Sequence, residues 1–211
     1  MAIQIETFVL GPLETNAYVL REGGACWVID PSFYPQNLLR RLAAEKLGLE
    51  RILLTHAHGD HIAGVAQLKQ AFPRAVLCCP AGDAAMLTSP QANLSAMMGL
   101  PISCPPADQV VHPGDVLTFA SSAWKVLDVS GHSPGGAAYY CAELGVVIAG
   151  DSLFAGGGVG RTDFPGGSIL RLLENIRANL MTLPPRTRVL SGHGPETTIG
   201  EEAQYNAFRA D

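Results

Sequence analysis

The sequence feature that most constrains the fold is a set of short apolar runs, several of which end directly in histidine or aspartate. Four such runs lead into the segments Thr55–His61, Ser130–His132, Gly150–Asp151 and Ser191–His193. Short apolar runs bounded by glycine, proline or aspartate are typical of strands. Because the carboxyl ends of neighbouring strands meet at one edge of a sheet, we expect these polar side chains to converge there. The glycine that precedes the histidine or aspartate in three of the four segments allows a sharp turn.

The rest of the chain mixes strand and helix patterns. Five further runs of strand length are Ala17–Leu20, Cys26–Ile29, Ala75–Cys79, Val116–Phe119 and Ala137–Cys141. Apolar residues at helical spacing predict helices over 38–46, 62–72 and 169–180, the last with Ser168 as its N-cap. A weaker helical pattern covers 81–87, and the proline-containing stretch 88–106 predicts a long loop with one helical turn. Since strands outnumber helices, an α/β fold with two sheets and helices outside them suits this pattern.

Composition narrows the class of protein. Apolar residues make up 47% of the 211 residues and charged residues 16%, which excludes a disordered chain. No linker or repeat divides the sequence, so residues 1–211 are expected to form a single domain. The net charge of −5 disfavours nucleic acid as a partner.

The expected setting is the cytoplasm. No run approaches the ~18 apolar residues of a membrane span, and the start of the chain has no signal-peptide pattern. The five cysteines are an odd number without a C-x-x-C pair, which predicts reduced thiols that mostly fill the core. Neither a membrane nor a nucleic acid is therefore an expected partner.

The segment His56–His61 has the pattern H-x-H-x-D-H. In an extended segment, residues two apart point the same way, so His56 and His58 can grip one metal ion. Asp60 and His61 then lie where the following helix begins, turned toward a second position. Imidazole and carboxylate are ligands that zinc, iron and manganese accept. The alternative is a capping aspartate with core histidines, but packing gives no reason for three histidines within six residues.

Three more candidate ligands follow the other strand-like runs. They are His132 in S-G-H-S-P-G-G, Asp151 in A-G-D-S-L-F and His193 in S-G-H-G-P-E-T. The sixth histidine, His112, stands in a His-Pro-Gly turn and has no strand leading into it, so we expect a solvated loop residue.

These motifs resemble the five ligand motifs of the metallo-β-lactamase superfamily. The resemblance extends from about Gly11 to Glu201 and implies an αββα four-layer sandwich with two divalent metal ions, most readily zinc, with iron or manganese as alternatives. His56, His58 and His132 would hold the first ion, Asp60, His61 and His193 the second, and Asp151 would bridge the two. Asp60 would also orient the hydroxide that lies between them.

The stretch 158–168, G-V-G-R-T-D-F-P-G-G-S, resembles the short bacterial glyoxalase II-like hydrolases. That resemblance implies cleavage of hydroxyacyl-thiol thioesters, with S-lactoylglutathione as the reference substrate. Arg161 is the expected substrate contact, because its fork of donors suits a carboxylate; the alternative is a structural salt bridge. Only 18 residues follow His193, so the C-terminal helical domain that grips glutathione in full-length glyoxalase II enzymes is not expected, and a short helix near 201–209 is.

Two other activities fit parts of this pattern. Persulfide dioxygenases resemble the chain as well, including a G-R-T-D-F stretch, but they hold a single iron with two histidines and one aspartate. Retention of Asp60, His61 and His193 favours the two-metal hydrolase. A lactonase is a lesser alternative.

Overall fold

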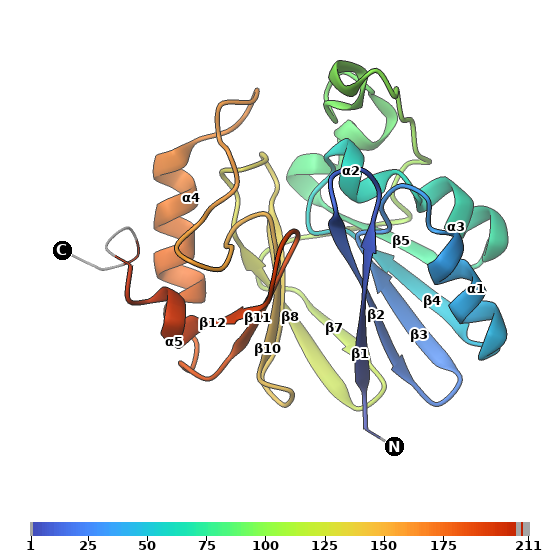
Figure 1. Cartoon of the computed structure of the whole chain (residues 1–211), viewed down its shortest axis with the longest axis horizontal. Coiled ribbons are helices and arrows are strands. Elements are labelled where there is room, and N and C mark those ends of the chain that lie inside the picture. Colours follow the sequence, from blue (N-terminus) through green and yellow to red (C-terminus); the bar gives the residue numbers. More distant parts are fainter. Residues whose placement is uncertain (1, 206–207, 209–211) are drawn as a thin grey trace. The chain divides into compact units, whose positions relative to one another are not determined.

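The computed structural model describes residues 2–205 and residue 208, and the chain divides into two compact units. The first unit comprises residues 1–79 and 84–110, and the second comprises residues 80–83 and 111–211. Each unit is built on one six-stranded sheet (Figure 1).

The sheet of the first unit follows the order of the chain. Its strands are β1 (Gln4–Leu10), β2 (Thr15–Glu22), β3 (Ala25–Ile29), β4 (Gly48–Leu53), β5 (Val76–Pro80) and β6 (Gln109–Val111). The pairs β1–β2 and β2–β3 are antiparallel, whereas β3, β4 and β5 run parallel. The parallel strands therefore direct their carboxyl ends to one edge, where the loop after β4 begins.

Helices α1 (Gln36–Ala44) and α3 (Val65–Ala71) cover one face of this sheet (Figure 1). Leu38 and Leu42 of α1 and Val65 and Leu68 of α3 are fully buried in one apolar cluster with the strands. The predicted helix over 62–72 is two helices, α2 (Gly59–Ile62) and α3, separated at Gly64. A Cβ on Gly64 would lie 2.6 Å from a main-chain oxygen, so the chain packs too closely here for any other residue.

Two short 3₁₀ helices follow β5, with the bounds Ala81–Thr88 for η1 and Ser95–Met98 for η2, and residues 84–88 of η1 and all of η2 belong to the first unit. The long loop predicted over 88–106 thus contains its one helical turn. The weak helical pattern over 81–87 corresponds to η1.

The sheet of the second unit has the order β12-β11-β10-β9-β8-β7. Its strands are β7 (Val116–Phe119), β8 (Ser122–Asp128), β9 (Ala137–Cys141), β10 (Val146–Gly150), β11 (Arg188–Ser191) and β12 (Thr197–Thr198). Among the described strand pairs of this second sheet, only β10 and β11 are parallel. The carboxyl ends of these two strands lie together, as the sequence predicted for the segments that follow them.

Helix α4 (Ile169–Asn175) begins at the predicted N-cap, because the Ser168 hydroxyl accepts a hydrogen bond from the Arg171 amide. It continues as a π-helical turn, η3 (Ile176–Leu180), and packs on the sheet through buried leucine and isoleucine side chains. The helix expected near 201–209 is the single turn α5 (Ile199–Glu202), closed by a capping box. Residues 206, 207 and 209, at the end of that expected helix, lie outside the described residues.

All nine predicted runs contain strands, but the sequence did not reveal β1, β6 or β12. Strand β1, Q-I-E-T-F-V-L, mixes polar and apolar residues, and of its seven residues only Leu10 is buried. Strands β6 and β12 have three and two residues, too few for a period to show.

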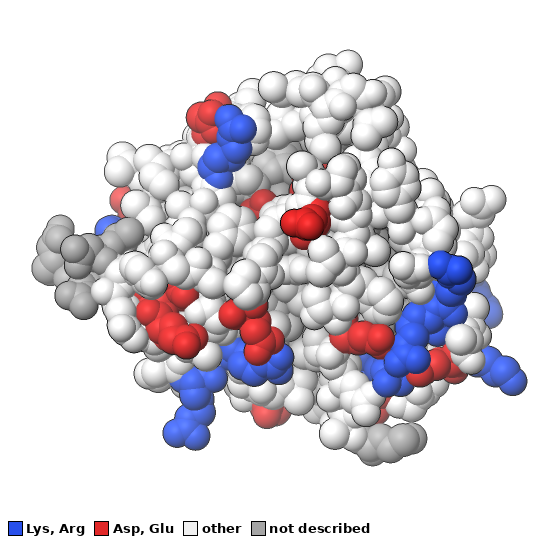
Figure 2. Space-filling model, in the orientation of Figure 1, with Lys and Arg blue, Asp and Glu red and all other residues white. Residues whose placement is uncertain are grey.

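The described residues contain no helix long and apolar enough to cross a membrane. Basic and acidic side chains lie beside each other on the face shown in Figure 2. Several form ion pairs within one unit, such as Arg21 with Glu45 and Arg188 with Glu196.

All five cysteines are free thiols and buried, as predicted. Burial raises the pKa of Cys26 and of Cys104 to about 12, because the desolvated thiolate is disfavoured. Burial likewise raises the pKa of Cys78 and Cys141. Since the thiolate is the reactive form, these side chains are inert core residues at neutral pH.

We therefore expect the folded protein to react hardly at all with a disulfide reagent such as DTNB at pH 8. The same protein in denaturant should release colour for all five thiols. Rapid reaction of any thiol in the folded protein, measured by absorbance over minutes, would contradict this burial.

Candidate metal centre

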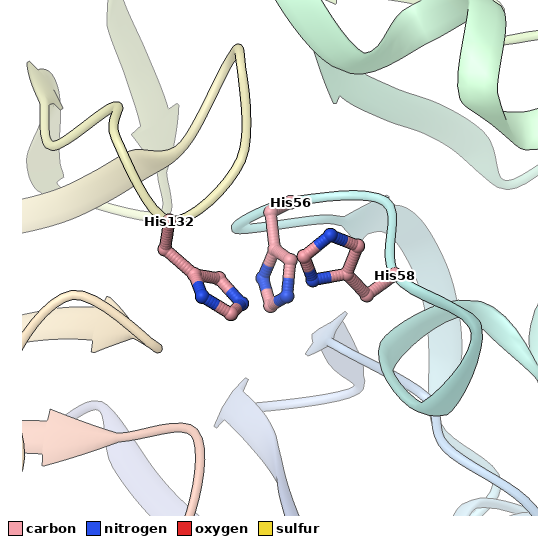
Figure 3. A group of neighbouring side chains, drawn as sticks. All are labelled: His56, His58 and His132. Atoms are coloured by element: carbon pink, nitrogen blue, oxygen red, sulfur yellow. The ribbon is translucent and has the colours of Figure 1, made fainter. Parts of the chain in front are cut away.

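The first unit brings together the four residues of the H-x-H-x-D-H motif. His56 and His58 follow β4 in an extended loop, and Asp60 and His61 lie in the first turn of α2. All four are buried, with exposed fractions between 0% and 9%. The His56 ring lies 4.7 Å from that of His58 and 4.1 Å from that of His61, measured between centroids. Figure 3 shows the first two imidazoles on this loop, and the His132 imidazole on the loop after β8.

Gly59 allows the motif to pack closely against the loop over 88–106. A Cβ on Gly59 would lie 2.8 Å from Cβ of Ser95, so a side chain does not fit. The Gly59 amide donates to the Asn93 carbonyl, 2.7 Å away. The buried Asn93 amide group in turn donates to two carbonyls of its own loop, those of Met86 and Ile102. The long loop over 88–106 therefore packs against the H-x-H-x-D-H motif and helps to hold it in place.

Asp60 is not the N-cap of the helix that follows it, because α2 begins at Gly59 with His58 as its N-cap. Its Oδ2 atom accepts a hydrogen bond of 3.3 Å from the Thr15 hydroxyl and lies 3.5 Å from Nε2 of His61. Thr15 thus fixes the Asp60 carboxylate beside the His61 ring.

Asp30 is a candidate supporting residue that the sequence reasoning missed. It is buried, and its Oδ2 atom lies 3.0 Å from Nδ1 of His61. Thr55 holds the same carboxylate through its amide (2.8 Å) and its hydroxyl (2.6 Å). A carboxylate on one ring nitrogen fixes the tautomer and makes the other nitrogen a better ligand. The signal was present, because the run Cys26–Ile29 also ends directly in an aspartate.

The second unit brings together His132, Asp151 and His193. Nε2 of His132 lies 3.6 Å and Nε2 of His193 3.5 Å from the same atom, Oδ2 of Asp151. These separations exceed the ~2.9 Å of an ordinary N–H···O hydrogen bond. They match the ~3.3–3.6 Å between two ligands that are each ~2.1 Å from one tetrahedral ion. The residues therefore fit divalent metal ions by both donor type and spacing.

The His132 ring is oriented by a main-chain group. Its Nδ1–H donates to the carbonyl of Arg161 over 2.6 Å, because a carbonyl can only accept. This leaves Nε2 turned toward Asp151. Gly160 makes the close approach possible, since a Cβ there would lie 2.7 Å from His132 Nδ1 and 2.2 Å from the Asp151 carbonyl oxygen.

Helix α4 holds the other side of the His132 loop. A Cβ on Gly131 would lie 2.4 Å from the Leu172 amide nitrogen, and Gly131 has φ of +132°. The Asn175 amide group bridges Asp128, the last residue of β8, and Ser130, which directly precedes this glycine. The glycine before the histidine therefore serves close packing as well as the turn.

The Arg161 side chain is exposed and forms a bidentate ion pair with Asp163, at 2.7 and 2.5 Å. Its guanidinium lies 4.2 Å from the centre of the Phe164 ring. The arginine lowers the pKa of Asp163 to about 2, so the pair stays charged at all ordinary pH values. The salt bridge that the sequence left open thus exists, and a substrate contact by the same side chain stays a prediction.

His112 is exposed in a turn, where its amide donates to the Asp115 carboxylate at 2.8 Å. It is a loop residue, as expected.

The fold and the two ligand sets define a class of protein. The family model of the metallo-β-lactamase superfamily matches residues 10–193, and the chain belongs to this superfamily. The predicted fold class is therefore confirmed, and with it membership of a superfamily of metallo-hydrolases.

Among its relatives, the chain is 36% identical over 200 residues to the probable metallo-hydrolase YqgX of Bacillus subtilis, covering 94% of each chain. It is 34% identical over 183 residues to the hydroxyacylglutathione hydrolase GloC of Haemophilus influenzae, covering 86% of this chain and 85% of that one.

Two solved structures are closely similar. The B3 metallo-β-lactamase BLEG-1 has a TM-score of 0.91 at 38% identity, covering 97% of this chain and 99% of that one. TTHA1623 in a di-iron-bound form has a TM-score of 0.85 at 37% identity, covering 97% and 100%.

Asp30 gives a first test of the site. Replacing it with asparagine removes the charge behind His61 and should weaken zinc binding by about 10- to 100-fold. Competition with a chromophoric chelator measures this change. His112→Ala is the matched control and should bind zinc like the wild type. Equal affinities for Asp30→Asn and wild type would show that Asp30 does not support a ligand.

Proposed function

We propose that the chain is a two-metal hydrolase that cleaves thioesters of the hydroxyacyl-thiol type, such as S-lactoylglutathione. The observation that carries this proposal is the Asp151 carboxylate, one oxygen of which faces the ligand nitrogens of two histidines from different strand ends. Such an oxygen suits a ligand shared by two ions. The relative named hydroxyacylglutathione hydrolase supports the substrate class.

In this proposal the candidate ligands of the first unit and those of the second unit bind the same two metal ions. His56, His58 and His132 would hold one ion, Asp60, His61 and His193 the other, and Asp151 would bridge them. The histidines and carboxylates suit zinc, iron or manganese, and zinc is the ion we propose.

Two such ions, when bound, lower the pKa of a water molecule toward neutrality and polarise the substrate carbonyl. The protein residues orient the water molecule and the ligand side chains. Asp60, held by the Thr15 hydroxyl, accepts a hydrogen bond from the attacking water and aligns it. The neighbouring imidazole is fixed in turn, because Asp30 holds Nδ1 of His61. A thiolate leaves with little protonation, so the site needs no separate acid.

Arg161 is the proposed contact for a substrate carboxylate. Asp163 engages Nε and Nη2 of its guanidinium. Among the described residues no hydrogen bond donated by Nη1 is found, so its N–H groups are available to a ligand. Stacking on Phe164 holds the plane of the fork in place.

Metal content tests the two-metal reading. We expect purified protein loaded with zinc to hold about two equivalents by elemental analysis. Asp151→Asn should weaken binding of both, because it removes the charge that the ions share. A stoichiometry of one with every metal tried would contradict the proposal and favour a mononuclear iron enzyme.

Substrate recognition is tested at Arg161. With S-lactoylglutathione, Arg161→Ala should lower kcat/KM about tenfold or more, the ~1.4 kcal/mol of one charged contact. The loss should appear mainly in KM, since the contact is remote from the chemistry. A thioester without the glutathione carboxylates should respond far less to the same change.

An equal response of both substrates would assign Arg161 a structural role. Oxygen uptake with glutathione persulfide, without thioester cleavage, would contradict the proposed function and indicate a persulfide dioxygenase. Hydrolysis of a β-lactam but not of the thioester would contradict it and indicate a β-lactamase. The similarity to a B3 metallo-β-lactamase makes the second assay a necessary comparison.

A further inference from the structure

A turn made of two glycines lies between Asp151 and Arg161. Gly156 and Gly157 have φ of +83° and +78°, backbone values that residues with a side chain rarely adopt. A Cβ on Gly157 would also lie 2.7 Å from the ring of Tyr205. Glycines have the largest conformational freedom of any residue, so this turn needs an external contact to stay in one conformation.

Glu202 of α5 supplies that contact. Its two carboxylate oxygens accept hydrogen bonds from the amides of Gly156 (3.1 Å) and Gly157 (2.6 Å). The Thr197 hydroxyl donates to the same carboxylate over 2.6 Å. Glu202 is only 2% exposed.

The burial of Glu202 is unusual for a charged group. In the part of the chain that the structure describes, it has no ion pair with a lysine or arginine. Its hydrogen-bond donors among the described residues are two main-chain amides and a hydroxyl, which are neutral groups. A buried carboxylate held by neutral donors carries a desolvation penalty that its hydrogen bonds must offset.

The segment held by Glu202 ends at the metal ligands. Phe154 and Gly158 close the turn through a hydrogen bond of 2.8 Å, and the Gly160 amide donates to the Asp151 carbonyl at 2.9 Å. The next carbonyl, that of Arg161, accepts the hydrogen bond from Nδ1 of His132. A shift of the glycine turn therefore moves the acceptor that orients His132.

We propose that Glu202 is a positioning residue for the metal centre: it clamps the Gly156–Gly157 turn and so fixes the Arg161 carbonyl against His132. The proposal rests on the proposed metal site. It predicts that metal affinity depends on a side chain that touches no metal ligand.

Glu201 offers a matched control, because it is the neighbouring glutamate on the same helix. Its carboxylate closes the capping box with Thr198 and does not contact the glycine turn. Glu201→Gln therefore perturbs the capping box and a 3.2 Å contact with the Thr197 hydroxyl, whereas Glu202→Gln weakens the hydrogen bonds to the glycine turn itself. Both variants keep the size of the side chain.

The experiment compares zinc affinity of the full-length variants by chelator competition, with thermal unfolding of the metal-free proteins alongside. We expect Glu202→Gln to bind zinc about tenfold more weakly than Glu201→Gln, which should match the wild type. In the zinc-loaded proteins, the low-field proton NMR signal of His132 Nδ1–H should broaden or shift in Glu202→Gln alone.

Thr197→Val is a second test in case Glu202→Gln does not fold. This variant removes one hydrogen-bond donor to Glu202 and leaves the sequence of the glycine turn unchanged. It should weaken zinc binding in the same direction by a smaller factor. Wild-type affinity in each folded clamp variant, or equal losses in Glu201→Gln and Glu202→Gln, would overturn the proposal. Failure of the wild type to bind zinc, iron or manganese would instead overturn the proposed function.

Discussion

The candidate site depends on the hydrogen bonds that hold the Nδ1 atoms of its histidines. An imidazole binds a metal ion through one nitrogen only when the other nitrogen keeps the ring in the right tautomer and orientation. In the first unit a buried aspartate, Asp30, holds His61. In the second unit a main-chain carbonyl, that of Arg161, holds His132. One unit thus uses a charge and the other a neutral dipole for the same purpose.

These contacts are possible because glycine stands where the chain passes closest to the ligands. Gly59 lies against Ser95, Gly131 against the start of α4, and Gly160 against the His132 ring. At each of these positions a single added carbon would overlap a neighbouring atom. Close packing therefore accounts for glycines that composition alone would assign to flexible loops.

The sequence was informative where a residue type acts through its own side chain. The H-x-H-x-D-H motif, His132, Asp151 and His193 all follow strand ends as predicted, and the buried thiols and the Ser168 N-cap are confirmed. Asp30 follows the same rule but was not recognised, because a lone aspartate after a strand is also a common turn residue.

The remaining features could not be derived from the sequence. The hydrogen-bond partner of His132 is a main-chain carbonyl. Every residue has such a group, so the residue type at position 161 does not reveal this contact. The break between α2 and α3 arises from close contact of Gly64 with the segment near Pro31, and contacts distant in sequence leave no local period. Strands β6 and β12 exist through pairing with longer neighbours and have no pattern of their own.

Residue 161 performs two separable tasks. Its carbonyl orients His132 from within the protein, whereas its side chain lies outside, paired with Asp163. Any amino acid that follows Gly160 supplies the same carbonyl. The side chain at this position can therefore be replaced without removing the carbonyl that orients the candidate ligand His132, so the outer surface and the inner contact are free to change independently.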